Sequence, residues 1–352
     1  MRVLPFAGAV LAAACVLFAP GCAGGDEPSG GGATTTIASA ANGSALRVGL
    51  VTDIGGLNDR SFNQGNYQGL LRAERELGLE GRVLQSKRAA DYVPNLSTLA
   101  RQDYDLVVAV GFLMADATDV VARRFPDTLF AIVDVPQASL KHKPTNVRGL
   151  VFKEQEGGYL AGYLAGLVVK EQGGRQVVST VGGIKIPPVD RYIAGFQAGA
   201  TAANPGVTTL NGYSQDFVDP ARCKEIALEQ IDRGSQVVMQ VAGGCGLGAL
   251  DAARERNVWG IGADADQSFL GPHILSSALK LNPVSIFQTI ESVQERSFRG
   301  GEDTVFDVES GAVGLGKISP RVPNEIVARV NQVQEDLAAG RITGIPTTLA
   351  AR

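Results

Sequence analysis

Residue types that carry catalysis or bind nucleic acid are scarce in this sequence of 352 residues. It has only two histidines, His142 and His273, and neither stands in a recognisable catalytic setting. It contains no G-x-S-x-G elbow, Walker loop, G-x-G-x-x-G fingerprint or metal-ligand spacing. The formal net charge is −4, so no basic surface is available to attract nucleic acid. These absences predict that the chain is not an enzyme, needs no metal or cofactor, and binds no nucleic acid.

Long apolar runs are also missing, except near the start of the chain. Residues 3–18 are almost entirely apolar, follow Arg2, and precede small residues that end at Cys22. This run is too short to cross about 30 Å of hydrocarbon comfortably, and its pattern is that of an export signal. The signal, over residues 1–21, resembles that of bacterial lipoproteins, so we expect acylation of Cys22 and a position on the outer face of the cell membrane. A cleavage box ending at Cys15, and an ordinary signal with free release, are the alternatives.

Residues 22–45 are rich in Gly, Ser, Thr and Ala and predict a flexible tether ahead of a folded part that starts near Leu46.

Cysteine is rare, with four residues in the chain. Once Cys15 leaves with the signal, Cys223 and Cys245 form an even pair in an oxidising compartment. Both are expected near the same edge of one sheet, which favours a disulfide between them. Two buried free thiols are the alternative.

Short β-branched runs alternate with longer helical patterns from Leu46 onward, and the alternation occurs twice. The first set predicts strands at 46–51, 82–86, 105–110, 128–134 and 146–152, with helices at 64–77, 92–102, 115–124 and 153–171. The second predicts strands at 175–183, 206–213, 235–244, 257–264 and 274–280, with helices at 189–203, 220–233, 247–256, 283–298 and 324–339. This alternation indicates parallel sheets covered by helices on both faces, and two sets indicate an α/β protein of two doubly wound, Rossmann-like lobes.

The lobes are expected at 46–150 and 151–275, with part of 276–320 returning to the first lobe. Residues 321–352 predict a C-terminal helix and tail, whose lobe the sequence does not assign. In doubly wound sheets ligands bind beyond the carboxyl ends of the strands, so the loops that follow the strands are where binding groups should lie.

The loops at these strand ends carry many acidic groups and few basic ones. The first loop, "VTDIGGLNDRSFNQG" from Val51 to Gly65, joins a strand to a helix. The candidate binding residues on the predicted edge are Asp53, Asn58, Asp59, Phe62, Asp134, Phe217, Gly243, Asp264 and Lys280. Other interpretations stay open for some of them: a helix cap at Asp59 or Ser61, core packing at Phe62, and a metal-binding D-x-D motif in the "DAD" that begins at Asp264.

This set of groups predicts the chemistry of the ligand. Several carboxylates face one lysine, an arrangement that repels phosphate and attracts hydroxyl, amine and amide groups. Carboxylates accept hydrogen bonds from vicinal hydroxyls, and aromatic rings on different lobes can stack on a flat ring. A flat nitrogenous ring that bears a polyol fits these groups, which means a nucleoside and not a nucleotide.

Together the motifs resemble the basic membrane protein family, the PnrA-like substrate-binding lipoproteins of ABC transporters. The resemblance spans about Leu46 to Thr348 and rests on "TDIGGLNDRSFNQ", "YDLVVAVGFL", "FPDTLFAIVD", "FKEQEGGYLAGYLAG", "VGGIKIPPV", "GFQAGA", "GADADQ" and "SSALK". It implies a type I periplasmic-binding-protein fold, in which two lobes joined by a hinge close over a nucleoside. We expect this ligand to be a purine nucleoside. It also implies a monomer that is anchored to the membrane by lipid and serves an ABC permease and its ATPase.

The resemblance implies a role for most of the candidate residues. Those implied for the base are Phe62 and Phe217 on its two faces, and Asn58 or Asp59 with Asp134 on its edge. Those implied for the ribose hydroxyls are Asp264, Gly243 and Lys280. The rival hypotheses are a binding protein for another small polar solute such as a sugar, and a surface receptor or adhesin that retains the fold.

Overall fold

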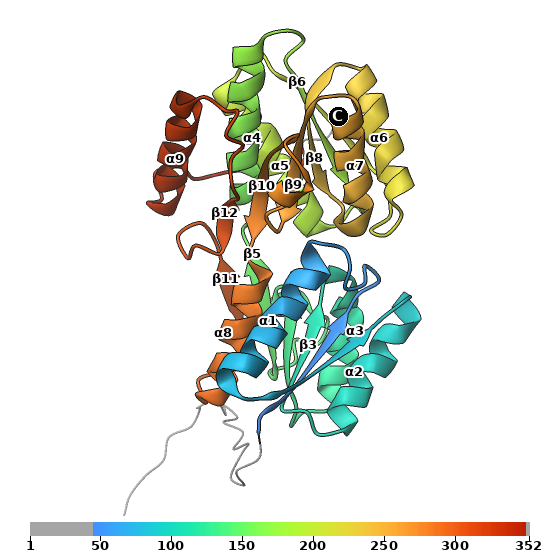
Figure 1. The fold of residues 1–352 in the computed structure, drawn as a ribbon. Helices are drawn as coiled ribbons and strands as arrows, with labels where there is room; N and C mark the ends of the chain where they lie inside the picture. The colour runs from blue at the N-terminus through green and yellow to red at the C-terminus, as the bar shows by residue number, and fades with distance from the viewer. Residues whose placement is uncertain (1–44, 350–352) are drawn as a thin grey trace, which may run out of the picture. The chain divides into compact units, whose positions relative to one another are not determined.

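The computed structural model describes residues 45–349, which all belong to one compact unit. The expected signal and tether, with Cys15 and Cys22, lie outside the described residues. The described chain forms two α/β lobes, each built on a six-stranded sheet (Figure 1). Within residues 45–349 no helix is both long and apolar enough to span a membrane.

The sheet of lobe 1 is parallel throughout, with the strand order β11-β5-β4-β3-β1-β2. Its strands are β1 (Arg47–Thr52), β2 (Glu80–Gln85), β3 (Leu106–Val110), β4 (Leu129–Val133), β5 (Val147–Phe152) and β11 (Asp303–Phe306). One face is covered by the adjoining helices α1 (Phe62–Leu77) and α8 (Asn282–Gln294), and the other by α2 (Tyr92–Arg101) and α3 (Ala115–Arg124). Because both faces are covered, β3 and β4 are almost wholly apolar and buried.

The sheet of lobe 2 has the corresponding order β12-β10-β9-β8-β6-β7, in which only β12 runs antiparallel to its neighbour among the pairings described. Its strands are β6 (Val177–Gly182), β7 (Thr208–Tyr213), β8 (Ser235–Val241), β9 (Trp259–Asp264), β10 (Ile274–Lys280) and β12 (Val313–Leu315). Its helices are α4 (Glu154–Gln172), α5 (Pro187–Ala203), α6 (Pro220–Asp232), α7 (Gly243–Glu255) and α9 (Asn324–Ala338). The described part of the chain also contains four short 3-10 helices: η1 (Ala89–Asp91), η2 (Phe112–Met114), η3 (Gln137–Ser139) and η4 (Ser268–Leu270).

The glycines of "EGGYLAGYLAG" allow α4 and α5 to pack with their backbones almost in contact. A Cβ on Gly162 would lie 1.9 Å from the carbonyl oxygen of Phe196, and one on Gly158 would lie 2.2 Å from that of Tyr192. Any larger residue would therefore push the helices apart. The stripe of small residues is a packing feature of lobe 2.

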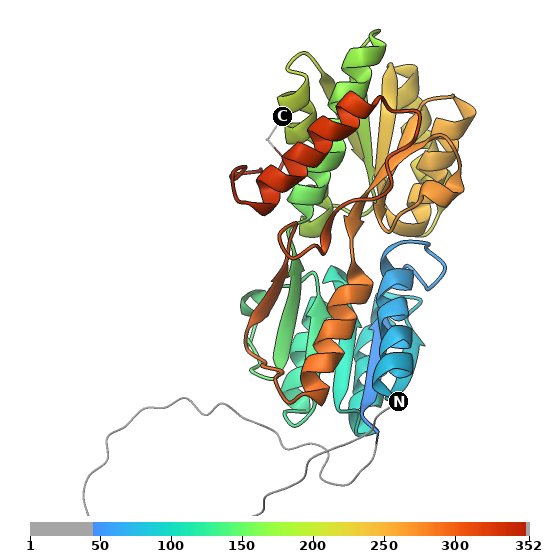
Figure 2. The same cartoon turned by 60° about the vertical axis from the view of Figure 1, so that its left-hand side comes forward.

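Between residues 45 and 349 the chain passes between the lobes three times, and these crossovers form the hinge (Figure 2). Lys153 joins β5 to α4, Leu281 joins β10 to α8, and residues 307–312 join β11 to β12. Of the range 276–320, the part that lies in lobe 1 is α8 with β11, whereas β10 and β12 belong to lobe 2. The last helix, α9, packs against α4 of lobe 2.

Several predicted elements differ in detail from the structure. Helix α7 begins at Gly243, not at Leu247, so the glycine-rich run assigned to the end of a strand is its first turn. Helix α1 begins at Phe62, two residues earlier than predicted, and the short strands β11 and β12 were not predicted. The expectation of purely parallel sheets is wrong for β12, a three-residue edge strand that returns beside β10.

Candidate ligand-binding cavity between the lobes

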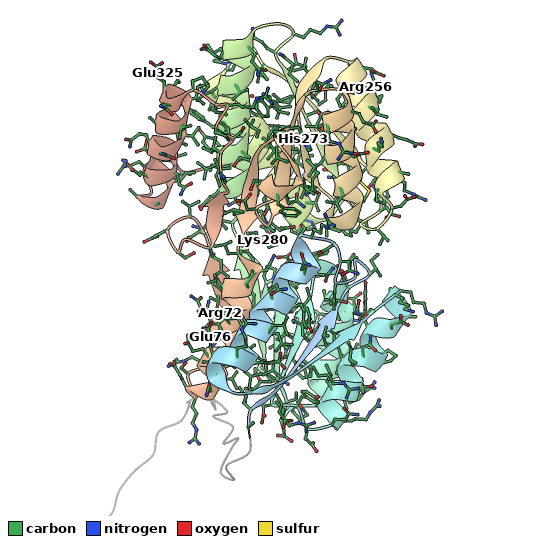
Figure 3. The ribbon with its side chains drawn as sticks, in the orientation of Figure 1. Arg72, Glu76, Arg256, His273, Lys280 and Glu325 are labelled. Carbon is green, nitrogen blue, oxygen red and sulfur yellow. A yellow bond between two sulfur atoms is a disulfide. The ribbon has the colours of Figure 1, made fainter. Side chains whose placement is uncertain are left out.

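A cavity of about 560 Å³, counting its opening to solvent, lies where the carboxyl ends of both sheets meet. Its charged lining residues are acidic apart from one lysine. The lining residues are Asp53, Gly55, Asp59, Phe62, Asn63, Gly111, Phe112, Asp134, Ile186, Pro188, Val189, Tyr192, Phe217, Val241, Ala242, Gly243, Asp264 and Lys280. Figure 3 shows Lys280 at the junction of the two lobes.

The turn between β1 and α1 is held by the carboxylate of Asp59. Its two oxygens accept hydrogen bonds from the backbone N–H groups of Ser61 (3.1 Å), Asn63 (2.7 Å) and Gln64 (3.0 Å). Asp59 therefore caps the start of α1 by accepting hydrogen bonds from N–H groups that have no partner within the helix. The hydroxyl of Ser61 makes no capping bond, so the alternative of a Ser61 cap is wrong. Burial raises the pKa of Asp59 to about 6, although the three N–H donors lower it.

Asp53 and Asn63 form a second fixed pair on the lobe 1 wall. The amide Nδ2 of Asn63 and the backbone N–H of Gly55 both donate to Oδ1 of Asp53, at 2.9 and 3.0 Å. This bond fixes the orientation of the Asn63 amide, whose Oδ1 is buried and has no hydrogen-bond partner in the described chain. Burial raises the pKa of Asp53, against the effect of these two donors. The wall therefore contains a buried amide oxygen without a partner in the described chain, on a residue that lines the cavity.

Two further aspartates stand at equivalent strand ends of the two lobes. Asp134 follows β4, and Asp264 is the last residue of β9. Both have positive φ, 72° and 66°, a left-handed conformation that aspartate tolerates better than most residues. Burial raises the pKa of both carboxyls, that of Asp134 to about 6.

Lys280, the last residue of β10, is the cation of the cavity wall. Its ammonium donates to Oδ1 of Asp134 (2.5 Å) and to Oε1 of Glu154 (3.0 Å), and all three side chains are almost fully buried. It also lies 5.1 Å from the centre of the Phe62 ring. Burial opposes the charge of Lys280, but Asp134, Glu154 and Asp264 outweigh it and raise its pKa.

Hydrogen bonds join the lobes directly on the cavity side. The hydroxyl of Ser61 in lobe 1 lies 2.8 Å from Oδ2 of Asp264 and 3.1 Å from the carbonyl oxygen of Ala263 in lobe 2. The amide of Gln267 donates to the carbonyl oxygen of Arg60 at 3.3 Å. The structure therefore represents a closed arrangement, with the lobes in contact across the cavity.

A disulfide supports the lobe 2 wall. Cys223, in the first turn of α6, is bonded to Cys245, in the first turn of α7, 22 positions further along the sequence. The backbone N–H of Cys245 donates to the carbonyl oxygen of Phe217 at 3.1 Å. The disulfide thus lies behind the two segments that bring Phe217 and Gly243 to the cavity.

Glycine makes room for one of the three phenylalanines that line the cavity. A Cβ on Gly183 would lie 2.3 Å from the Phe217 ring. Phe62 also packs on the core of lobe 1 and Phe217 on that of lobe 2, so each ring combines core packing with a face at the cavity.

Residues 46–343 match the family described as ABC transporter substrate-binding protein PnrA-like, or Bmp. The chain belongs to this PnrA-like family. Its relatives include the CD4+ T-cell-stimulating antigen of Listeria monocytogenes, 33% identical over 84% of this chain and 87% of the relative. They also include the ABC transporter nucleoside-binding protein BmpA of Lactococcus lactis, 31% identical over 85% of this chain and 88% of the relative.

Solved structures place the PnrA-like chain in the same fold. The ABC transporter solute-binding protein from Aeropyrum pernix aligns with a TM-score of 0.77 and 26% identity, over 86% of this chain and 94% of the other. The prediction of a type I periplasmic-binding-protein fold with two α/β lobes is thus confirmed, as is the family resemblance.

The structure brings most of the predicted site residues together. Asp53, Asp59, Phe62, Asp134, Phe217, Gly243, Asp264 and Lys280 all line the cavity. Asn58 does not: it is exposed, because the turn directs the neighbouring Asp59 inward to bind the start of α1. Asp266 of the "DAD" motif accepts from the backbone N–H groups of Ser268 and Lys317, and the described residues include no group of three or more metal-ligating side chains.

Sequence reasoning missed Asn63, Tyr192 and Glu154. Asn63 follows Phe62 in the recognised turn, so its place beside the cavity could have been inferred from the helix start. The hydroxyl of Tyr192 lies 3.3 Å from Oδ1 of Asp264, a contact that links residues 72 positions apart and that no local motif signals. Glu154 stands in the motif "FKEQEGGYLAGYLAG" at the start of the glycine-rich helix, and its bond to Lys280, 126 positions away, has no local signal.

Proposed function

We propose that this protein captures nucleosides outside the cell membrane and delivers them to the permease and ATPase of an ABC importer. The observation that carries the proposal is the cavity itself, in which phenylalanines from both lobes, Phe62 and Phe217 among them, accompany four aspartates and a single lysine. Two rings suit the two faces of a base, and carboxylates suit the hydroxyls of a ribose. The name of the Lactococcus lactis relative supports the same ligand class.

The charges of the cavity favour a ligand without phosphate. The one cation, Lys280, already shares its charge between Asp134 and Glu154. A phosphate would meet Asp53, Asp59 and Asp264 with no free positive partner in the cavity lining, so its desolvation would not be offset. Nucleosides, which are neutral, avoid this cost.

The binding mechanism that we propose is closure at the hinge. Phe62 and Phe217 belong to different lobes, so a nucleoside that touches both binds the closed arrangement more tightly and shifts the population toward it. Asp264 and Lys280 would bind the ribose, and Asp134 with Asp59 or Asn63 would face the base edge. We further propose that the protein acts as a monomer, does not transform its ligand, and is anchored by lipid at Cys22.

A thermal-shift and calorimetry panel tests this proposal on the protein without its signal. Adenosine, guanosine, inosine and uridine form one arm; AMP, ribose and galactose form the others. We expect nucleosides to raise the melting temperature and to remain chemically intact, while AMP and the sugars have little effect. Binding of a sugar but of no nucleoside would overturn the proposal.

A further inference from the structure

A chain of four alternating charges crosses the hinge beside the cavity. It runs from Asp134 in lobe 1 to Lys280, then to Glu154, and ends at Arg191 on α5 of lobe 2. Glu154 is fully buried and binds two cations at once: its Oε1 accepts from Lys280 at 3.0 Å, and its Oε2 accepts from Nε of Arg191 at 2.6 Å. Neither Glu154 nor Arg191 lines the cavity.

Lysine alone does not define where its ammonium points, because its stem has four flexible carbons. The ammonium has three N–H donors, and the two carboxylates account for two of them. Because Asp134 of lobe 1 and Glu154 at the start of α4 accept two of these N–H bonds, the direction of the third N–H is fixed. Lys280 lines the cavity, so this third N–H is the one available to a ligand. Without Glu154, the ammonium would be free to swing around Asp134.

We propose that Glu154, supported by Arg191, is a positioning residue that holds the ammonium of Lys280 in place for the ligand. The inference rests on the proposed function, in which Lys280 binds the nucleoside. Glu154 occupies the first position of α4, where the helix N-terminus favours a negative charge. Arg191 supplies the second cation, so that Glu154 is not drawn wholly toward Lys280. Since Glu154 and Lys280 stand at adjoining crossovers, their bond persists when the lobes open.

The chain offers a matched control in Glu156, two residues further along α4. Its carboxylate contacts the ammonium of Lys153 (3.5 Å) and accepts a hydrogen bond from the backbone N–H of Val308 (2.9 Å), which lies in the crossover between β11 and β12. Glu154→Gln and Glu156→Gln make the same chemical change in the same helical turn, but only the first removes a partner of Lys280.

Adenosine titrations of these variants test the inference. We expect Glu154→Gln to weaken binding at least tenfold and Glu156→Gln to change it less than twofold. In a Lys280→Met background, Glu154→Gln should cost no further affinity, because its effect passes through Lys280. An equal loss in both backgrounds, or no loss in the parent, would overturn the inference. If Glu154→Gln does not fold, Arg191→Met takes its place, with the same pattern expected at smaller size.

A measurement without ligand separates this inference from the proposed function. In protein with ¹⁵N-labelled lysine, we expect one ammonium signal protected from exchange, identified by its loss in Lys280→Met. It should disappear in Glu154→Gln and remain in Glu156→Gln. If the parent binds no nucleoside, the proposed function fails, but this signal still decides whether Glu154 holds Lys280. A protected signal that survives Glu154→Gln refutes the positioning role.

Discussion

The two lobes place an aspartate at the same point of their sheets and give it different partners. β4 and β9 hold the same position in the two strand orders, and Asp134 and Asp264 share the left-handed backbone at their ends. Asp134 binds the buried ammonium of Lys280, whereas Asp264 is bound by the hydroxyls of Ser61 and Tyr192. The same backbone geometry therefore carries two kinds of carboxylate: that of Asp134 is paired with a buried cation, and that of Asp264, held by two neutral hydroxyls, keeps lone pairs that can accept further hydrogen bonds from a ligand.

The largest effect on ligand binding should come from removing the carboxylate of Asp264. We expect Asp264→Ala to weaken nucleoside binding about 100-fold, because hydrogen bonds to a charged group contribute about 1.5–3 kcal/mol each. Calorimetric titration measures this change. Asp266→Ala is the control from the same "GADADQ" run; its carboxylate binds only backbone N–H groups in the described chain, and affinity should stay within about twofold. Similar losses in both variants would remove the distinction between the two aspartates.

The carboxylate of Asp134 should contribute more to the free energy of unfolding than that of Asp264. Asp134→Ala deletes the shortest bond of Lys280 and should lower the free energy of unfolding by about 2 kcal/mol, with Glu154 left as the remaining acceptor. Urea unfolding followed by circular dichroism measures this loss at pH 7. Asp264→Ala should cost less than about 1 kcal/mol in the same assay, and the reverse order would contradict the comparison.

The pH dependence of stability sharpens the contrast. The pKa of Asp134 is raised by burial from 3.8 to about 6 in the folded protein, so between these values the unfolded chain loses its proton first. Stability should therefore fall as pH rises through this window, by up to about 1.4 kcal/mol per pH unit for this group. Asp134→Asn should remove this slope from the parent profile. Asp59, whose pKa is also raised to about 6, is present in both proteins and cancels. Parallel profiles for parent and variant would show that Asp134 does not titrate there.

The smallest effect concerns the hydroxyl that joins the lobes. Ser61→Ala removes the contact to Asp264 and should lower nucleoside affinity about fivefold, because the closed arrangement loses about 1 kcal/mol. Small-angle scattering with saturating ligand should show less complete compaction than in the parent. Ser139→Ala, at an exposed hydroxyl of lobe 1, should change neither quantity. Tighter binding by Ser61→Ala would mean that the ligand competes with Ser61 for Asp264.

The fold could be predicted from the sequence because each strand and helix in the two alternating sets has its own pattern in a contiguous stretch of residues. The turn from Val51 to Gly65 was recognised for the same reason, since its residues are contiguous. The start of α7 was missed because a run of glycines has low helix propensity, and what holds it is the bond from Cys245 to Phe217, 28 positions away. Asn58 and Asp59 are neighbours of similar polarity, and only the three N–H bonds at the start of α1 decide which one turns inward.

The charge chain at the hinge could not be predicted, because its members are distant in sequence. Lys280 and Asp134 are separated by 146 positions, and Lys280 and Glu154 by 126. No periodicity or local motif signals such pairs, and only the meeting of two crossovers brings them together. The roles of the cavity residues toward a ligand stay predictions.

The disulfide between Cys223 and Cys245 has a practical consequence for anyone who prepares the protein. A disulfide forms only under oxidising conditions, so protein expressed in a reducing bacterial cytosol would carry two free thiols behind the segment that contains Phe217. Ligand affinities from such a preparation would describe a looser molecule than one matured by secretion. A thiol count on the purified sample should precede any titration.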